Sequence, residues 1–455
     1  MDIKNRKRWI ILTAVVSVLL IVGINLVGFG AEKVKINCVS SPDNADALTD
    51  FSKEFMAKYP DIKVKVVPLS WEVLTPRILA DFASHAGAYD TMTWDLMSAG
   101  AYYRYLADLD KIRKEYPDIV DPNYDIDDFI PLAWHVYGTW GEKNIGLPFY
   151  GAAMFLFYRK DLFEDPVIKA KFKEMFGKEL EVPKTREEAI QVSKFFTKKY
   201  NPDSPTKYGV ALMFPRTHTL FYMYLNYFGP LRRSPAGIAK FGEVDFEYGD
   251  FFTADHKPAF NSLEGLKALE LMKTQMAYSP DPLGSDYGET LEYFSKGLVA
   301  MVPQWTACIA SWKTSPELSP FNEKVGVAII PGGYPVSGGW GLGINNDCKH
   351  KKEAYMWIQF ATDKRHDKLH WLRYNVGPAR YSTCRDPEVL KEYPWLKDIY
   401  IRSLERASNR PRIPEEPKLE DITVGVLSEI LLGRKPATLE TLQKLADQWM
   451  RILKH

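Results

Sequence analysis

Apolar and polar positions alternate along the first part of the chain in a repeated strand-and-helix pattern. The apolar run 34–39 predicts a buried strand, and the apolar residues of 48–59 fall on one face of a helix that Pro60 ends. Further strands are predicted at 62–67 and 89–94. Strands that alternate with helices of this length predict βαβ units and a mostly parallel sheet.

The same alternation resumes further along the chain. Strands are predicted at 146–149, 153–158, 298–302 and 325–330, and helices at 186–200, 261–276, 351–362 and 439–453. The sequence contains no internal repeat. Because 455 residues exceed the usual size of a single hydrophobic core, two α/β domains are expected.

The first 30 residues have a different pattern from the rest of the chain. Four Lys and Arg residues between positions 4 and 8 precede the apolar run 9–27, and Gly28-Phe29-Gly30 precedes Ala31. This arrangement predicts a signal peptide over residues 1–30 and export to the periplasm or the cell exterior. The apolar run is long for a signal peptide, so a retained membrane anchor stays as the alternative.

Composition and charge exclude several classes of function. Residues 1–30 carry four Lys or Arg and one Asp, so without them the chain has 55 Lys and Arg against 57 Asp and Glu, a formal net charge of −2. No basic stripe remains, so nucleic acid is not an expected partner. The four cysteines (Cys38, Cys308, Cys348 and Cys384) lack metal-ligand spacing, and the sequence does not choose among their three possible pairings.

The ends of the predicted strands carry the candidate binding residues, because ligands of open α/β sheets bind just beyond the carboxyl ends of strands. These positions hold Ser41, Asn44, Trp94, Asp95, Tyr150, Trp305, Gly339 and Trp340. They mix aromatic planes with hydrogen-bonding groups and contain no cluster of histidines and carboxylates. No catalytic residue, metal site or cofactor is therefore predicted.

Catalytic motifs give no support to an enzyme. The chain has no G-x-S-x-G, H-E-x-x-H, phosphate-loop or C-x-x-C motif, and the glycine run 338–343 does not have the G-x-G-x-x-G spacing. A glycosidase needs only two carboxylates at a set separation, so a secreted glycan-active hydrolase stays as the alternative function.

Five segments carry a resemblance to a known family. They are NIGLPFYGAAMFLFYRKDL (144–162), VPKTREEAIQVSKFF (182–196), EYFSKGLVAMVPQW (292–305), VGVAIIPGG through GGWGLGINNDCKHKKEAYMWIQF (325–360) and GPARYS (377–382). In this order the segments resemble the extracellular solute-binding proteins of sugar-type ABC transporters, the group that includes maltose-binding protein. The resemblance runs from about residue 33 to the C-terminus.

The resemblance implies a two-lobed periplasmic-binding-protein fold of type II, with the ligand in a cleft between lobes that hinge crossovers join. One lobe would comprise residues 32–147 and 300–341, and the other residues 148–299 and 342–455. The chain would cross between lobes near residues 149, 298 and 341. It would work as a monomer that captures a carbohydrate and delivers it to a membrane permease, without enzymatic activity.

The resemblance also implies roles for individual residues. Trp94, Trp305 and Trp340 would cover the apolar face of a sugar ring, and Asp95 and Tyr150 would hydrogen-bond its hydroxyl groups. The alternatives are packing roles for the tryptophans and a helix-capping role for Asp95.

Other candidates are less specific. Gly339 would let the backbone approach the cleft, Arg380 would donate to vicinal hydroxyls or an acidic sugar, and Ser41 and Asn44 would bind the ligand from the first loop. A surface arginine and a plain capping turn are the alternatives. Asp43 belongs to the same first loop as Ser41 and Asn44, and Trp71, Phe214, Arg216 and Phe221 are weaker candidates.

The ligand itself stays open at this point. Ala152 stands where maltose-binding protein has an acidic residue, so a maltodextrin is not implied. A sugar, a polyol, a phosphorylated polyol or another small polar solute all remain compatible with the sequence.

Overall fold

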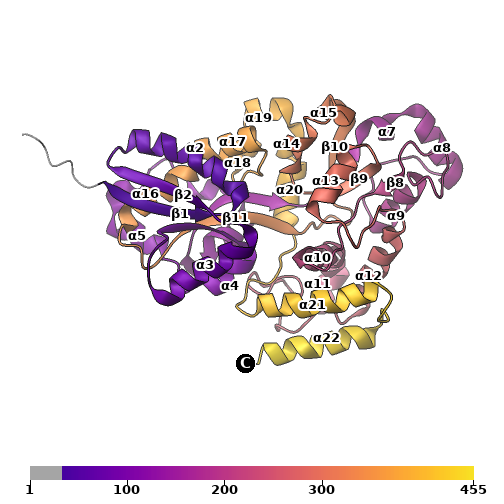
Figure 1. Ribbon diagram of the computed structural model, residues 1–455. Helices are drawn as coiled ribbons and strands as arrows, with labels where there is room; N and C mark the ends of the chain where they lie inside the picture. The colour runs from indigo at the N-terminus through magenta and orange to yellow at the C-terminus, as the bar shows by residue number, and fades with distance from the viewer. Residues whose placement is uncertain (1–32, 455) are drawn as a thin grey trace, which may run out of the picture.

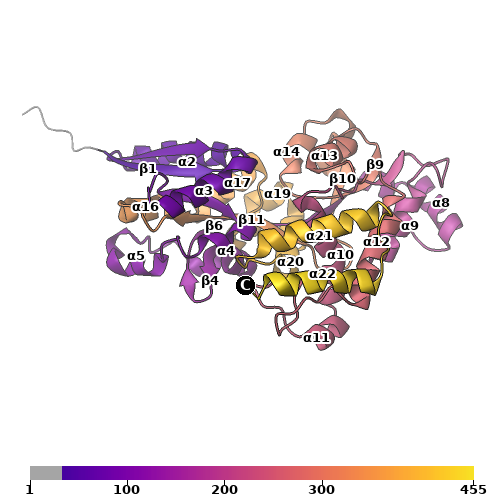
Figure 2. The same ribbon diagram turned by 60° about the horizontal axis from the view of Figure 1, so that its bottom comes forward.

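Two separate β-sheets organise the computed structural model, which describes residues 33–454 (Figure 1). The first sheet lies at one end of the molecule and the second at the other, each with its own helices (Figures 1 and 2). The expected signal peptide, residues 1–30, lies outside the described residues. Within residues 33–454, no helix is long and apolar enough to cross a membrane.

The first sheet has the strand order β2-β1-β3-β11-β6. Its strands are β1 (Val34–Ser40), β2 (Ile62–Pro68), β3 (Thr91–Asp95), β6 (Leu147–Ala153) and β11 (Ser337–Ile344). As the βαβ pattern predicts, β1 is parallel to β2 and β3. However, β11 runs antiparallel to β3 and β6, so the expectation of a mostly parallel sheet is wrong. The helices around it are α2 (Pro42–Lys58), α3 (Trp71–Ser84), α4 (Ala99–Tyr102), α5 (Leu109–Glu115), α6 (Pro131–Ala133), α16 (Lys351–Ala361) and α17 (Lys364–Tyr374).

The second sheet has the strand order β10-β7-β9-β8. Its strands are β7 (Phe155–Arg159), β8 (Tyr208–Val210), β9 (Val299–Gln304) and β10 (Val325–Ile329). The helices of this part are α7 (Lys160–Glu164), α8 (Pro166–Phe176), α9 (Arg186–Phe195), α10 (His218–Arg232), α11 (Pro235–Phe241), α12 (Leu263–Met276), α13 (Tyr287–Ser295), α14 (Cys308–Trp312), α15 (Phe321–Lys324), α21 (Glu416–Leu431) and α22 (Leu439–Ile452). Helix α21 packs along α10, and α22 packs on α12 and α21.

Short elements fill the space between these parts. They are the β4–β5 hairpin (Thr139–Trp140 and Lys143–Asn144), α18 (Tyr381–Cys384), α19 (Pro387–Glu392), α20 (Ile399–Arg406) and single turns at Leu96–Ser98, Pro117–Ile119, Ile126–Asp128, Trp134–Gly138, Pro316–Leu318 and Pro394–Lys397. Helix α20 contacts both sheets: the Tyr400 ring stacks on Phe155 of β7 with 5.4 Å between centroids, and its hydroxyl donates to the Gly151 carbonyl of β6 at 2.6 Å.

Two hydrophobic cores result from the alternation of side chains along the strands. Phe155 and Phe157 of β7 belong to a core that extends through α20 to the first sheet. Leu156, between them, belongs to a second core made by the opposite face of the second sheet and helices α9, α10, α12, α21 and α22. The two lobes therefore share apolar packing on one side of the second sheet.

The chain crosses between the sheets at three places, and two of the three expected crossings are wrong. It leaves the first sheet at Met154, between β6 and β7, returns at 330–336, between β10 and β11, and leaves again at 407–415, between α20 and α21. The return expected near residue 298 does not occur, because β9 pairs with β7 and β8 inside the second sheet.

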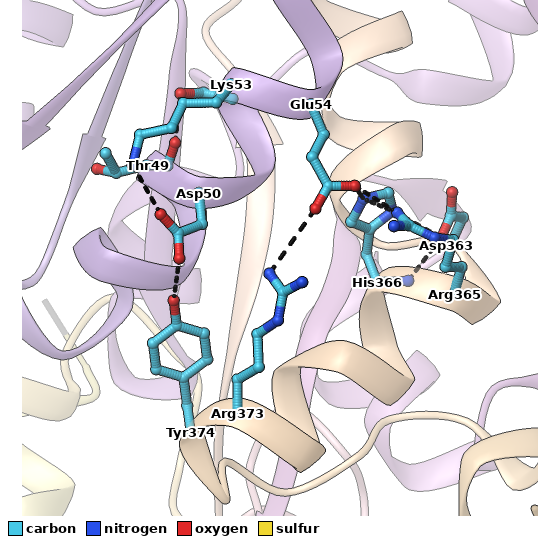
Figure 3. Close-up of polar contacts among 10 residues, drawn as sticks. Thr49, Asp50, Lys53, Glu54, Asp363, Arg365, His366, Arg373 and Tyr374 are labelled. Atoms are coloured by element: carbon cyan, nitrogen blue, oxygen red, sulfur yellow. Dashed lines mark hydrogen bonds and ion pairs between the residues drawn. The ribbon is translucent and has the colours of Figure 1, made fainter. Parts of the chain in front are cut away.

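The expected division of the later chain into lobes is corrected accordingly. Residues 300–329, expected in the first lobe, lie with the second sheet, and residues 342–374, expected in the second lobe, lie with the first. A polar network between α2 and α17 shows the physical reason (Figure 3). Glu54 accepts a hydrogen bond from Arg365 at 2.6 Å, and Asp50 accepts one from Tyr374 at 2.8 Å, which fixes α17 to the first lobe.

All four cysteines are buried and free, so none of the possible disulfide pairings is present. The expected fold class, an α/β protein with two lobes joined by crossovers, is confirmed.

Candidate functional site

A row of three side chains crosses the first sheet at the edge that faces the second lobe. Strand register pairs Trp340 of β11 with Asp95 of β3 on one side and with Tyr150 of β6 on the other. Laterally paired residues project from the same face of a sheet, so these three share one face. The row combines an indole, a carboxylate and a phenol.

Trp94, expected to face the ligand together with Asp95, lies on the opposite face. Successive residues of a strand point to opposite faces, so only one of the two can join the row. The Trp94 ring fills the space that Gly341 leaves, because a Cβ at Gly341 would lie 2.6 Å from Cε2 of the ring. Trp94 is 1% exposed and packs in the first core, which is the packing role that the sequence left as the alternative.

Trp305 reaches the row from the second lobe. It follows β9, and its ring lies over Gly338, where a Cβ would approach Cζ3 of the ring to 2.7 Å. Gly338 and Trp340 are two residues apart and share a face. The Trp305 ring also meets Tyr222 of α10 edge-on, with 5.8 Å between centroids. Trp305 therefore lies at the junction of the two lobes, partly exposed.

Gly339 allows β11 to pass close to its neighbours. Its φ of +126° is a conformation that side chains rarely adopt, and a Cβ there would lie 2.5 Å from the Tyr150 carbonyl oxygen. Gly146, Gly151 and Gly341, which also lie in or beside these strands, do not have positive φ, and Gly341 makes room for a ring.

The third crossing brings an arginine to the row. Arg410 pairs with Asp95 at 3.3 Å, donates to the Met97 sulfur at 2.9 Å and lies over the Tyr222 ring. Burial by itself lowers the pKa of Arg410, but the carboxylates of Asp95 and Glu416 outweigh burial and raise it. Arg410 is therefore charged while only 4% exposed, and its Nε has no hydrogen-bond partner.

Two carboxyl groups of α21 complete this side of the junction. Burial raises the pKa values of both Glu416 and Glu420 above the usual range, and the charge of Glu420 raises the pKa of Glu416 further. The positive charge of Arg410 lowers both pKa values, but by less. The negative charge of Asp95 also raises the pKa of both carboxyls. Figures 1 and 2 show the start of α21 beside α4 of the first lobe, where a Cβ at Gly100 would lie 2.2 Å from the Arg412 carbonyl oxygen.

Tyr150 and Tyr287 lie on opposite sides of the junction. Burial raises the pKa of each well above the usual range, and the Asp43 carboxylate raises both further. Asp43 begins α2 in the first lobe, whereas Tyr287 begins α13 in the second. The Asp43 carboxylate of the first lobe therefore acts electrostatically on the Tyr287 phenol of the second lobe.

Ser41 and Asn44 are both fully buried at the start of α2. Ser41 is the N-cap residue of α2, but its side chain accepts no hydrogen bond from the helix backbone; it accepts one from Asn44 Nδ2 at 3.0 Å instead. Asn44 Oδ1 has no hydrogen-bond partner.

Arg380, expected to face the ligand, is instead buried within the first lobe, where it holds backbone segments together by hydrogen bonds. It is 0% exposed and donates to the carbonyl oxygens of Thr362 at 3.0 Å and Asp125 at 2.8 Å. It pairs with Asp128 at 3.5 Å and lies 3.7 Å from the Phe129 ring centroid. A planar guanidinium with five N–H donors suits a site with several carbonyl oxygens. The position of Arg380 in the sequence does not show whether it binds ligand or backbone carbonyls.

The weaker candidates do not join the row. Phe214 and Phe221 lie in the second core, and Arg216 is exposed. The Trp71 side chain is outside the part that the structure describes.

Two cavities of the described residues lie elsewhere on the first lobe. One of about 340 Å³ is lined by Lys33, Met56, Pro60, Ile62 and Lys63, and one of about 450 Å³ lies between the C-terminal end of α2, residues 118–122 and α16. Across residues 33–454, no group of three or more His, Cys, Asp or Glu is arranged to hold a metal ion.

The arrangement at the junction suits a polyhydroxylated ligand. Aromatic faces cover C–H surfaces, and carboxylates and a guanidinium bond hydroxyl groups. Five residues of the junction were not expected from the sequence: Tyr222, Arg410, Glu416, Glu420 and Tyr287. One signal was available, because Glu416 and Glu420 are four residues apart on an otherwise apolar helix face.

Comparison with known proteins identifies the class. The family model described as "Bacterial extracellular solute-binding protein" matches residues 41–368. The chain belongs to this family. Its expected role as the solute-binding subunit of an ABC importer, rather than a hydrolase, is confirmed at the level of the family, whose members are binding proteins.

Particular relatives are similar over most of their length. A probable amino-acid ABC transporter periplasmic-binding protein of Sinorhizobium fredii is 23% identical over 79% of this chain and 76% of its own length. The mannitol-binding protein of Pseudomonas aeruginosa is 25% identical over 86% of this chain and 84% of its own length. A solved solute-binding protein from Agrobacterium radiobacter in complex with ribitol is 25% identical, covers 91% of this chain and 98% of its own, and has a TM-score of 0.69.

Proposed function

We propose that this protein captures a sugar or polyol at the junction of its two lobes and delivers it to a membrane permease. The row of Asp95, Trp340 and Tyr150 in the first lobe, with Trp305 of the second lobe beside it, carries this proposal. A pyranose or polyol has C–H surface for the indoles and hydroxyl groups for the carboxylate and phenol.

The relatives support the same ligand class. One is named for mannitol, and one is solved with ribitol. The relative named as a probable amino-acid binder makes an amino acid the rival ligand. The aromatic planes at the row favour a sugar or polyol, because an amino acid offers less flat C–H surface to cover.

Closure of the lobes follows from where the ligand would lie. Three crossings, at 154, 330–336 and 407–415, join the lobes, and a ligand in the junction would contact both. Such a ligand favours the closed arrangement by its differential affinity for that arrangement. We propose that the closed form is what the permease recognises and that the protein acts as a monomer.

The cellular location completes the proposal. The cationic start and apolar run of residues 1–30 indicate export, with the mature chain beginning near Ala31. The protein would then meet its ligand and the permease outside the cytoplasm. N-terminal sequencing of the exported protein is the check, and retention of Met1 would favour a membrane anchor.

A ligand panel tests the proposed function. The chain without residues 1–30 is screened by thermal shift against polyols, mono- and disaccharides, sugar phosphates and amino acids. A ligand at one hundred times its dissociation constant adds about 2.7 kcal/mol of stability, which gives a clear rise in melting temperature. Stabilisation by amino acids, with none by sugars or polyols, would refute the carbohydrate assignment.

A further inference from the structure

Helix α21 brings two carboxyl groups to the junction, and Arg410, the arginine that acts on both, is already paired with Asp95. Glu416 and Glu420 are four residues apart, so they lie one above the other on the same helix face. Glu416 is 2% exposed. The buried atoms Glu416 Oε1 and Glu420 Oε2 accept no hydrogen bond from any described donor.

The charged and titratable groups around this pair leave it with an excess of negative charge. They are Asp95 of β3, Arg410 of the third crossing and Asp421 of α21, and beyond Arg410 lie His218 of α10 and Asp286. Arg410 already pairs with Asp95 at 3.3 Å. Burial, and then the charge of Arg410, lower the pKa of His218, which is therefore neutral at pH 7.

Two further buried polar atoms, both on residues that interact with Asp95, lack partners. Arg410 Nε and the Tyr137 hydroxyl are buried without hydrogen bonds, and Tyr137 is 1% exposed. The negative charge of Asp95 raises the pKa of both Tyr137 and Arg410. Native proteins satisfy nearly all buried polar groups, so unpartnered atoms from three segments of the chain mark a place where a ligand completes the hydrogen bonding.

We propose that Glu416 and Glu420 bind a protonated amine, so that the ligand of this protein is an amino sugar or an amino polyol. The inference rests on the proposed function and specifies its ligand. An ammonium group has three donors and one positive charge, which matches two adjacent carboxylates with free oxygens. A neutral polyol brings no positive charge that could replace a proton on the pair, so it gains nothing from two ionised carboxylates, whose burial without a cation is costly.

Without ligand, the pair reduces this cost by holding a proton between its two carboxyls. Each carboxyl lies within hydrogen-bonding reach of the other, in accord with the raised pKa values. When the ammonium binds, it replaces the shared proton as the positive partner, and that proton passes to solvent. The amine keeps its own three protons, so one proton is released for each pair that was protonated.

Matched probes test the proposal on the unmodified protein. The chain without residues 1–30 is titrated calorimetrically with pairs of compounds that differ in one group: 1-amino-1-deoxy-D-glucitol and D-glucitol, D-glucosamine and D-glucose, D-galactosamine and D-galactose. In at least one pair, the amine is expected to bind about ten-fold more tightly, as a charged hydrogen bond exceeds a neutral one. Its binding heat should depend on the ionisation enthalpy of the buffer, because a proton is released.

Variants locate the effect. Glu416→Gln and Glu420→Gln keep the shape of the side chains and should weaken binding of the amine more than binding of its neutral counterpart, so that most of the amine's advantage is lost. Asp447→Asn is the matched control: it removes one exposed charge from α22, which packs on α21, and should leave the preference intact.

Each outcome decides the proposal. If the neutral member binds as tightly as the amine in every pair, or if only neutral sugars bind, the amine assignment is wrong and the carbohydrate function stands. If no sugar, polyol or amine binds at all, the proposed function fails and the inference with it. An amine preference that persists in both glutamine variants would place the ammonium elsewhere.

Discussion

Replacing Gly339 with alanine should destabilise the protein strongly, because two separate costs meet at this position. The φ of +126° is strained for any residue with a Cβ, which costs about 1–3 kcal/mol. The new Cβ would also lie 2.5 Å from the Tyr150 carbonyl oxygen and 2.9 Å from the Tyr137 ring, and relief of such overpacking costs about 1–3 kcal/mol more. The expected loss is about 2–6 kcal/mol.

Two other glycines separate these costs. Gly141 has a φ of +52° and nothing within 4 Å of the place that a Cβ would take, so Gly141→Ala should cost only about 1–2 kcal/mol. Gly288, in α13, has ordinary φ and open space, so Gly288→Ala should stabilise by about 0.4–1 kcal/mol. Urea unfolding followed by circular dichroism gives the three values. If Gly339→Ala cost no more than Gly141→Ala, the close approach of β11 to β6 would be wrong.

Two further predictions concern buried charges of the first lobe. Burial raises the pKa of Asp367 to about 6, so this carboxyl stabilises the fold below its unfolded pKa and that contribution is lost as pH rises through 6. Asp367→Asn should therefore become more stable than the parent as pH rises from 4 to 7, by up to about 3 kcal/mol. A stability gain that shrinks with rising pH would contradict the raised pKa of Asp367. Arg380→Ala should cost about 3–5 kcal/mol, because it leaves Asp128 unpaired, without changing the ligand affinity of the folded protein; a selective loss of affinity would return Arg380 to the ligand site.

Sequence patterns predict local elements well here, but they do not say which sheet a strand joins. The segment 298–302 was predicted as a strand, and β9 occupies Val299–Gln304. Its partners, β7 and β8, are far away in the chain, and an apolar run fits a buried strand in either lobe. The lobe boundaries were wrong for this reason, whereas the α/β class was predicted correctly from the repeated alternation and the two-lobed fold from the family resemblance.

The same limit applies to the candidate site. The sequence indicated both Trp94 and Asp95, yet alternation along a strand allows only one of them on the face of Trp340, and the register with β11 decides which. Arg410 and Asp95 are 315 positions apart, so no local pattern links them. The i, i+4 spacing of Glu416 and Glu420 was visible, but only the fold shows that the pair faces Arg410.

The most direct test of the ligand site is a calorimetric titration of the tightest ligand from the panel against Asp95→Asn. Asp95 lies in the row with Trp340, and its replacement removes a charge while keeping the side-chain shape. We expect a ten- to hundred-fold weaker affinity, which corresponds to about 1.5–3 kcal/mol for hydrogen bonds to a charged group. Asp118→Asn, which removes an exposed carboxylate paired with Lys352 on the same lobe, should bind like the parent. Equal affinities for the parent and for folded Asp95→Asn would contradict a ligand site at the junction of the two lobes.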